Sequence, residues 1–420
     1  MTYKSTDEIL ETPVTWGNIE DHLRSSLKTE AKFGSNMGVV DIGDGTGYAS
    51  RCGLITCDWV GAGQDEKLPT KVIVKIPSIL PMRRLNEALP KEQRMFDSEE
   101  AWTKLEGTVS QVHNIEIASY QFLGEFESLE VPKMFFGYRM EPGAEINGQL
   151  CMSFVDNTDM MNYHKAHTVE QLRQVAKALG AIQACSINKE PTSPEFLKDV
   201  FSEFAATVTK EVYCNVFKML LLFDPSERVV KMVEEIEKIL PEYYGSNLPS
   251  TIHKQLNYKP VLVNGDMRTE NVLINKDTGD LAALIDWQCT HLGVGVEDLI
   301  RVTVFALPAK ERRESKDELL TLMYNTMVEN IHGAEPPYTL EQLSEVYDLL
   351  FPHCSLYFAT SAPILMKTLM EKPGIPEEIK QKCLAIQLDK VLGAVEDIVE
   401  YDKLNRKSPR TLEFRQQIDQ

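Results

Sequence analysis

The chain has 420 residues, of which 43 % are hydrophobic, so it is long enough for two domains and can bury a substantial core. Its formal net charge of −19 argues against binding to nucleic acid or to anionic membrane surfaces, because both need clustered Lys and Arg. The cysteines include no C-x-x-C pair, which argues against a zinc or redox site of that spacing, and we expect free thiols that act as small core residues.

The N-terminus carries acidic residues early and has no apolar run of signal-peptide length. No window approaches 18 uninterrupted apolar residues, so we expect no membrane span and a reducing, cytoplasmic location. The first regular element is a helix within 14–27, where Val14, Ile19, Leu23 and Leu27 recur at mostly helical spacing.

Glycines and alternating apolar residues dominate the next part of the chain. The segments RCGLITCDWV (51–60) and TKVIVKIPS (70–78) predict strands, joined by a hairpin connection at 61–69. Residues 98–127 are predicted to be helical, with the clearest segment at 109–126, and two further strands, at 131–140 and 148–155, follow. This order predicts an antiparallel sheet with one helix packed on it.

Three glycines, Gly43, Gly45 and Gly47, precede the first of these strands with the spacing G-x-G-x-G. A dinucleotide-binding turn instead needs G-x-G-x-x-G between a strand and a helix. We therefore predict a hairpin flap over nucleotide phosphates, which would be bound by backbone N–H groups and the Ser50 hydroxyl. The alternative is a flexible hairpin tip without a ligand.

Lys75 lies inside the apolar strand VIVKIP, and alternation places it on the same face as Ile73. A lysine in such a strand is costly unless its ammonium group is paired. Glu116, on the predicted helix, is a suitable partner. The alternatives are an exposed edge-strand lysine and a solvated helix acid.

After about residue 158 the chain becomes mainly helical, with apolar faces in 168–186, 226–240 and 385–402. The polar stretch NTDMMNYHKAHT marks a boundary between the two halves. The predicted domains are an N-terminal lobe at 1–150, a hinge at 151–158 and a C-terminal lobe at 159–420.

The segment VLVNGDMRTENVLINKDTGDLAALIDWQ places three oxygen-bearing side chains, Asp266, Asn271 and Asp286, at the ends of short apolar runs. Phosphoryl transfer needs a carboxylate beside the attacking hydroxyl and hard oxygen ligands for magnesium. A loop bearing an Asp and an Asn, followed by a hairpin that ends in a second Asp, would supply all three groups. The alternative is that they are ordinary turn residues.

With these motifs in order, the chain resembles the ecdysteroid-kinase-like (CHK kinase-like) family, which is related to aminoglycoside phosphotransferases and choline kinases. The resemblance covers nearly the whole chain and rests on the segments IGDGTGYASRCGLITCDW, VIVKIP, HNIEIASY, VNGDMRTENVLI, LIDWQ and GVGVEDLIRV. It implies an α+β, bilobal protein-kinase-like fold. The N-lobe would be a small antiparallel β-sheet with one packed helix, and the larger C-lobe would be mainly helical.

The resemblance also implies roles for single residues. Asp266 would be the catalytic base, and Asn271 and Asp286 would hold magnesium. Lys75 would bind the α- and β-phosphates of ATP and pair with Glu116. Two further roles are implied: backbone near Ser153 to Val155 would meet adenine, and Asp298 would support the catalytic loop.

The chain departs from the family at Asn264, where related kinases usually have the His of His-Gly-Asp. The leading hypothesis is an ATP- and magnesium-dependent small-molecule kinase that transfers the γ-phosphate to a hydroxyl group. The alternative is a catalytically silent nucleotide-binding pseudokinase or interaction protein, which Asn264 favours. A protein kinase is disfavoured, because LIDWQ lacks the glycine of D-F-G.

The sequence does not identify the phosphate acceptor or an oligomeric state. Stretches rich in aromatic residues and Met, within 195–225 and 300–370, are compatible with an apolar pocket for a lipophilic or steroid-like alcohol. They are equally compatible with ordinary helical core. His291, His353 and Tyr357 are ambiguous in the same way.

Overall fold

The computed structural model describes residues 4–43, 49–88, 96, 98–141, 148–205, 209–243 and 246–407. The chain forms two compact units. Unit 1 consists of Met1–Glu127 and Val131–Asp156, and unit 2 consists of Ser128–Glu130 and Asn157–Gln420. Each unit is described by itself below.

Unit 1 is built on a five-stranded sheet with the order β2-β3-β5-β7-β6, in which every neighbouring pair is antiparallel. Strands β1 and β4 form a separate two-stranded antiparallel ribbon. The elements of unit 1 are α1 Trp16–Leu27, β1 Lys32–Phe33, β2 Gly38–Asp41, β3 Ser50–Thr56, β4 Trp59–Val60, β5 Lys71–Pro77, α2 Leu80–Ala88, α3 Glu99–Leu123, β6 Met134–Tyr138 and β7 Gln149–Ser153.

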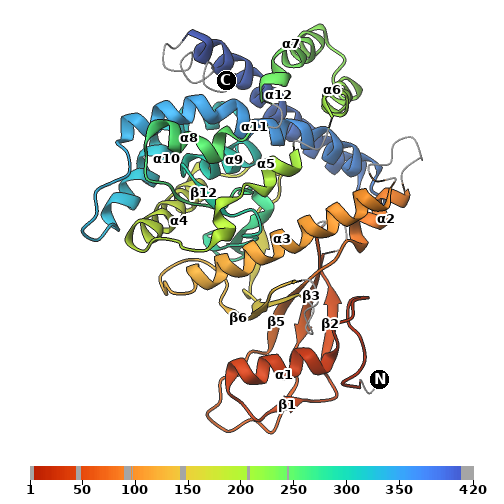
Figure 1. Cartoon of the computed structure of the whole chain (residues 1–420). Helices are drawn as coiled ribbons and strands as arrows, with labels where there is room; N and C mark the ends of the chain where they lie inside the picture. The colour runs from red at the N-terminus through yellow and green to blue at the C-terminus, as the bar shows by residue number, and fades with distance from the viewer. Residues whose placement is uncertain are drawn as a thin grey trace. The chain divides into compact units, whose positions relative to one another are not determined.

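Strand β5 shows why the sheet carries helices on both faces. Its alternate residues Val72, Val74 and Ile76 are at most 2 % exposed, and they share one core cluster with Trp16 and Ile19 of α1. The opposite face carries Lys75, whose Nζ contacts Glu116 of α3. Figure 1 shows α1 beside this sheet. The prediction of a single packed helix is therefore corrected: α1 also packs on the sheet, because its apolar stripe needs a partner.

Helix α3 lies within the helical stretch 98–127 that the sequence predicted. It begins at Glu99, where the N-cap residue Ser98 accepts a hydrogen bond from the backbone N–H of Ala101. Its N-terminal half buries Leu105 and Val109 in a small core cluster with Met82 of α2. Glu116 therefore lies well inside the helix.

Unit 2 contains the remaining elements and is mainly helical. They are β8 Thr158–Met160, α4 Val169–Asn188, η2 Pro194–Leu197, α5 Val200–Ala205, α6 Lys210–Lys218, η3 Met219–Leu222, α7 Glu227–Tyr243, α8 Leu248–Leu256, β9 Val261–Val263, η4 Thr269–Asn271, β10 Val272–Asn275, β11 Leu281–Leu284, β12 His291–Gly293, α9 Val296–Ala306, α10 Ala309–Glu329, α11 Leu340–Glu371 and α12 Glu377–Lys407.

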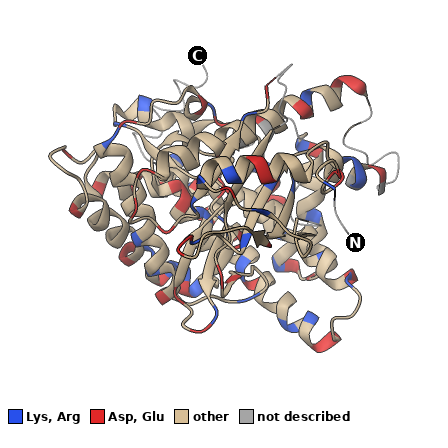
Figure 2. Cartoon of the chain, turned by 90° about the horizontal axis from the view of Figure 1, so that it is seen from below, with Lys and Arg blue, Asp and Glu red and all other residues tan. Residues whose placement is uncertain are grey.

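The long helices of unit 2 pack in pairs, α4 with α10 and α11 with both α9 and α12. Helix α11 is long and apolar enough to cross a membrane by composition, but 67 % of its most apolar window is buried inside the structure. Burial against other helices is the behaviour of a core helix. Acidic and basic residues alternate along the helices (Figure 2), and several pair, such as Arg173 with Glu318.

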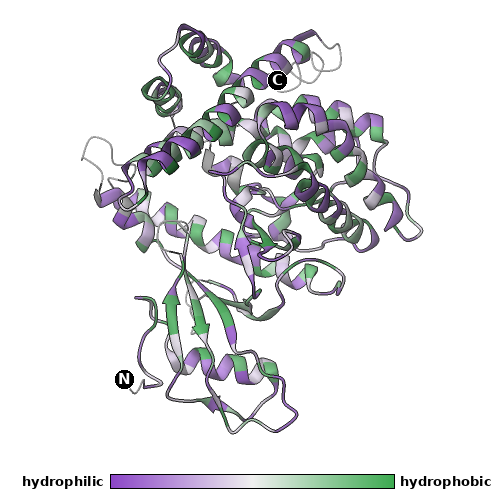
Figure 3. Cartoon of the chain, turned by 180° about the vertical axis from the view of Figure 1, so that it is seen from behind, coloured by the Kyte–Doolittle hydropathy of each residue, from purple (hydrophilic) through white to green (hydrophobic). Residues whose placement is uncertain are grey.

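Three short antiparallel pairings position the loops of unit 2. Strand β9 pairs with β12, while β10 forms a hairpin with β11 and also pairs with β8. The loop 264–271 leaves β9, and the loop 285–290 leaves β11. The predicted fold class is confirmed: a small antiparallel-sheet unit, whose strands are largely hydrophobic in Figure 3, and a larger, mainly helical unit.

Candidate active site

In unit 1, Lys75 and Glu116 form a buried ion pair. The lysine Nζ lies 2.7 Å from both Oε1 and Oε2 of Glu116. The side chains are 13 % and 2 % exposed, so neither is the exposed edge residue that the sequence left open. Strand β5 supplies the lysine and α3 the glutamate, because the Ile73–Lys75 face of the strand looks toward the helix.

Two of the predicted nucleotide-binding residues, Gly43 and Ser50, lie at the ends of neighbouring strands of the same sheet. Gly43 follows β2, and its N–H donates to Oδ1 of Asp41 over 2.9 Å. Ser50 is the first residue of β3. The other two glycines of the loop, Gly45 and Gly47, lie outside the described residues.

The predicted hinge begins at the end of β7. Ser153 is already engaged there, because its N–H donates to the carbonyl of Lys133 over 2.8 Å and its Oγ accepts from the N–H of Lys133 over 2.9 Å.

In unit 2, the three predicted oxygen-bearing residues are joined by one set of hydrogen bonds. Asn271 Nδ2 donates to the carbonyl of Asp266 over 2.7 Å, and Asn264 Nδ2 donates to the carbonyl of Asp286 over 3.1 Å. Asn264 Oδ1 also accepts from the N–H of Asp266 over 3.0 Å. Asn264 thus holds together the two loops that carry Asp266 and Asp286.

Asp298, in the first turn of α9, supports the same loop from below. Its carboxylate accepts from the N–H groups of Asn264 and Gly265 over 2.8 and 2.9 Å. Gly265 has a φ of +79°, and a Cβ there would lie 2.4 Å from the Cys289 carbonyl oxygen, so only glycine fits this turn. Asp286 also has a positive φ, of 62°, a strained conformation that is concentrated at functional sites.

Asp266 is the residue with the most unusual environment. Burial, reinforced by Asp286 and Glu270 and opposed by Arg268 and Arg301, raises the pKa of its carboxyl to about 6. Its Oδ1 is buried and has no hydrogen-bond partner among the described residues. A buried carboxylate oxygen without a partner is costly unless a ligand supplies one.

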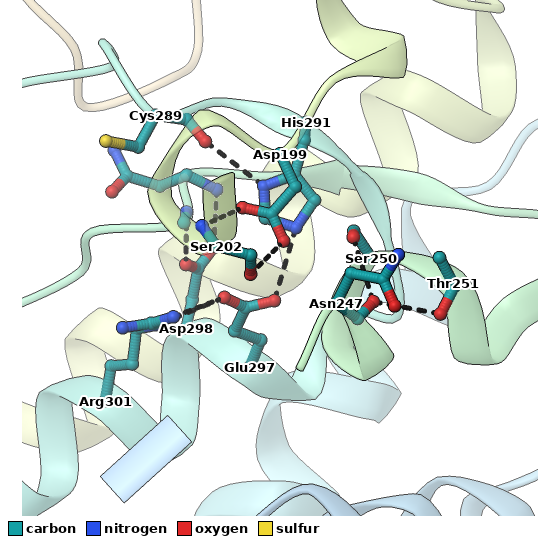
Figure 4. A network of polar contacts seen from close by, with 12 residues as sticks. Asp199, Ser202, Asn247, Ser250, Thr251, Cys289, His291, Glu297, Asp298 and Arg301 are labelled. Carbon is teal, nitrogen blue, oxygen red and sulfur yellow. Dashed lines mark hydrogen bonds and ion pairs between the residues drawn. The ribbon is translucent and has the colours of Figure 1, made fainter. Parts of the chain in front are cut away.

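A second set of charged residues lies under the loop (Figure 4). His291 Nδ1 contacts the Cys289 carbonyl over 3.1 Å, and its Nε2 lies 3.3 Å from Oε2 of Glu297. Arg301 donates to Oε1 of Glu297 from Nε over 3.0 Å and from Nη2 over 2.9 Å. All three charged side chains are at most 4 % exposed, so this cluster anchors β12 to α9 and is not open to a ligand.

No group of three or more His, Cys, Asp or Glu side chains within the described part of the chain is arranged to hold a metal ion. The donor set nevertheless suits a hard cation. The bond from Asn271 Nδ2 to the Asp266 carbonyl leaves the amide oxygen Oδ1 of Asn271 as a ligand, and Asp286 adds a carboxylate. Magnesium typically takes one or two such protein ligands and completes its shell with phosphate oxygens and water.

The stretches suggested as an acceptor pocket are mostly core. Phe217, Leu220, Phe351, Cys354 and Phe358 are at most 1 % exposed. These residues therefore stabilise the helical unit, and they do not by themselves form an open apolar pocket.

The sequence profile of the DUF1679 family, which is described as "Uncharacterized oxidoreductase dhs-27", matches residues 2–406 of this chain. The chain belongs to the DUF1679 family. A protein of Caenorhabditis elegans, "Uncharacterized kinase-like protein D1044.1", is 22 % identical over 315 residues, which are 74 % of this chain and 79 % of that protein.

Two solved structures also resemble this DUF1679 protein. The Plasmodium vivax ethanolamine kinase Pv091845 is 10 % identical with a TM-score of 0.40, and the similarity covers 85 % of this chain and 81 % of that one. The aminoglycoside phosphotransferase of Alicyclobacillus acidocaldarius is 9 % identical with a TM-score of 0.38, and the similarity covers 87 % and 92 % of the two chains.

The chain combines the antiparallel-sheet unit and the mainly helical unit that the sequence predicted. The sheet unit carries the Lys75–Glu116 pair, and the β10–β11 hairpin of the helical unit lies between the loops of Asn271 and Asp286. Sequence patterns did not single out Arg268, whose guanidinium lies beside Asp266, because one arginine in a polar loop gives no signal. The partnership of His291 with Glu297 was also missed, although both flank the glycine-rich turn before α9.

Proposed function

We propose that this protein is an ATP- and magnesium-dependent small-molecule kinase, which transfers the γ-phosphate of ATP to a hydroxyl group of an acceptor. The observation that carries this proposal is the state of Asp266: its buried Oδ1 has no hydrogen-bond partner in the part of the chain that the structure describes, and its loop is fixed by Asn264, Asn271 and Asp298. A general base must reach the proton that it removes and must have a pKa near the working pH. Asp266, with a pKa of about 6, meets the second condition at neutral pH.

In the proposed reaction, one phosphorus–oxygen bond forms and one breaks. The acceptor hydroxyl would bind to Asp266 Oδ1, which orients its oxygen and receives its proton. That oxygen forms a bond to the γ-phosphorus of ATP. The bond from this phosphorus to the β–γ bridging oxygen breaks, and its electron pair remains on ADP.

The remaining site residues would bind the nucleotide. Lys75, held by Glu116, would contact the α- and β-phosphates, while backbone N–H groups of the glycine loop, near Gly43 and Ser50, would contact phosphate oxygens. Asn271 and Asp286 would hold magnesium, which neutralises the phosphate charge when bound. The acceptor would be a small hydroxylated compound, and the proposed location is the cytoplasm, where the free cysteines would remain reduced.

The family description raises the possibility of an oxidoreductase. A nicotinamide-binding domain of the usual kind needs a parallel sheet with a glycine-rich turn between strand and helix. Every strand pairing within the described residues is antiparallel, and Gly43 follows a strand of a hairpin. These observations favour phosphoryl transfer.

A silent pseudokinase remains the second candidate, because Asn264 replaces the usual His. Asn264 nevertheless makes both hydrogen bonds that a supporting residue needs in this loop. The presence of Asn in place of the usual His therefore keeps the hydrogen bonds that hold Asp266 in position.

The test combines binding and turnover. ATP with magnesium should raise the melting temperature of the wild-type protein, and a library of hydroxylated metabolites should contain compounds that accelerate ATP consumption. Asp266→Asn should keep the thermal shift and lose turnover by about 10²–10⁴-fold, because only the base is removed. Asp317→Asn, an exposed helix residue with the same charge change, is the matched control. Absence of any ATP-induced shift would refute the proposal, whereas a shift without turnover for any acceptor would favour the pseudokinase.

A further inference from the structure

Arg268 is a half-buried cation beside the carboxylate of Asp266. Its side chain is 23 % exposed, and its Nε lies 3.8 Å from Oδ2 of Asp266. That distance is too long for a hydrogen bond. The Nε is buried and has no hydrogen-bond partner among the described residues.

Two buried arginines of this chain are anchored closely. Arg301 donates from two nitrogens to Oε1 of Glu297 at 2.9–3.0 Å. Arg51 lies 2.7 Å from a carboxylate oxygen of Asp41 and donates to the Leu10 carbonyl. Arg268 thus differs from these two structural arginines in having a carboxylate nearby but no close bond to it.

The backbone holds Arg268 in place independently of its guanidinium. Its N–H donates to the Asp266 carbonyl over 2.9 Å, and its carbonyl accepts from the N–H of Asn271 over 3.0 Å. The side chain therefore projects from a fixed turn between the proposed base and the proposed metal ligand. A planar guanidinium whose Nε has no hydrogen-bond partner among the described residues can donate to the oxygens of a phosphoryl group at such a point.

We infer that Arg268 is a catalytic residue that binds the phosphoryl group during its transfer. This inference rests on the proposed function. The hydroxyl held by Oδ1 of Asp266 must lie in line with the γ-phosphorus, and Arg268 approaches the other oxygen of the same carboxylate. Its N–H groups donate to the equatorial oxygens of the phosphoryl group as the bond to the acceptor oxygen forms and the bond to ADP breaks. Arg268 takes no part in proton transfer, which belongs to Asp266.

The experiment uses the full-length protein and needs no knowledge of the acceptor. Thermal shifts are measured with ADP and magnesium, and again after addition of aluminium fluoride, which mimics the transferred phosphoryl group. In the wild type, aluminium fluoride should add a second stabilisation, because a ligand that binds the folded state raises its stability. Arg268→Gln should keep the ADP shift and lose most of the second increment.

Arg228→Gln is the matched control, because Arg228 is 63 % exposed on α7 and its loss changes the net charge equally. It should behave as the wild type in both measurements. Arg268→Lys should keep part of the second increment, since a lysine retains the charge but not the planar fork. Once an acceptor is known, Arg268→Gln should lower kcat about 10²–10³-fold with little change in the KM for ATP.

The outcomes separate this inference from the proposal beneath it. If the wild type shows no ADP shift, the proposed function fails. If the wild type responds to ADP and to aluminium fluoride and Arg268→Gln responds equally, only the role of Arg268 is overturned. An Arg268→Gln variant that keeps the second increment and instead raises the KM for the acceptor would also overturn it, because the arginine would then bind the acceptor.

Discussion

Asn264 shows how one side chain can replace another in a supporting role. It is completely buried, and its amide accepts from the N–H of Asp266 and donates to the carbonyl of Asp286. A residue there needs one acceptor and one donor, which Asn supplies in a single planar group. The chemistry of the loop therefore depends on these two bonds and not on the ring of a histidine.

The variant Asn264→Ala tests this reading. It leaves a buried N–H and a buried carbonyl without partners, so the free energy of unfolding should fall by about 2–4 kcal/mol. Urea denaturation measures the loss. Asn325→Ala, at an exposed position on α10, should change stability by less than about 0.5 kcal/mol. Equal stabilities of the Asn264→Ala variant and the wild type would show that the two bonds contribute nothing.

His291 predicts a pH dependence of stability. Although burial alone would lower it, the carboxylates of Glu297 and Asp199 raise the pKa of His291 to about 10. A group whose pKa is raised on folding stabilises the protein fully below its unfolded pKa, near 6.5, and this contribution is lost as the pH rises through the folded value. The wild type should therefore lose stability between about pH 6.5 and 10.

The variant His291→Gln isolates this contribution. It should be less stable than the wild type at pH 6, and the difference should shrink steadily toward pH 10, because the wild type alone loses the charged interaction. His332→Gln, at an exposed position, is the control and should run parallel to the wild type. A constant difference between His291→Gln and the wild type at all pH values would contradict the prediction. Denaturation curves at intervals of one pH unit provide the measurement.

At the scale of elements, the alternation of apolar residues and the turn residues were sufficient to predict a strand or hairpin wherever one face of the segment is buried. Strand β5 was predicted within one residue at either end, because Val72, Val74 and Ile76 alternate with Lys75. The β10–β11 hairpin was predicted from its turn and from the apolar run before Asp286. Helix α3, Glu99–Leu123, was predicted within the helical stretch 98–127, because its buried apolar residues recur at helical spacing. The packing of α1 on the sheet was missed because an apolar stripe shows that a partner exists but not which one.

The segment before α1 is attached to the sheet by charge. Glu11 accepts from Arg51 of β3 over 3.0 Å and from Arg84 of α2 over 2.7 Å, while Arg51 also lies 2.7 Å from Asp41 of β2. Leu10 and Glu11 both have positive φ angles, near 55°, which such contacts must stabilise. The four charges thus connect the N-terminal segment to both strands that flank the glycine loop.

Of the two arginines that pair with Glu11, the more buried one should contribute more to the stability of the protein. The Arg51 side chain is 10 % exposed and Arg84 is 50 % exposed. Arg51→Met should lower the free energy of unfolding by about 1–3 kcal/mol, because Asp41 loses its partner. Arg84→Met, which breaks the exposed bond to the same glutamate, should cost less than about 1 kcal/mol. Urea denaturation of both variants would reject this ranking if Arg84→Met were the more damaging.

At the scale of the whole molecule, the proposed chemistry divides between two units. Lys75 and Glu116 belong to unit 1, and Asp266, Asn271 and Asp286 belong to unit 2. The sequence could predict both groups because each has a local motif. It could not predict the environment of Asp266, since burial in the folded unit raises the pKa of its carboxyl and leaves Oδ1 without a hydrogen-bond partner among the residues that the structure describes.

A double variant tests whether residues of both units act on one nucleotide. Lys75→Met and Asp286→Asn should each reduce the thermal shift caused by ATP and magnesium, the first through the phosphates and the second through the metal. If both groups bind the same ATP molecule, the double variant should lose at least as much of the shift as the worse single variant, because each substitution removes a contact to that ligand. The shift must be measured relative to each variant without ligand, since Lys75→Met also leaves the buried Glu116 carboxylate without its ammonium partner. A Lys75→Met variant that keeps the full shift, while Asp286→Asn loses it, would mean that Lys75 does not bind this ATP, and the assignment of Lys75 to the phosphates would then be wrong.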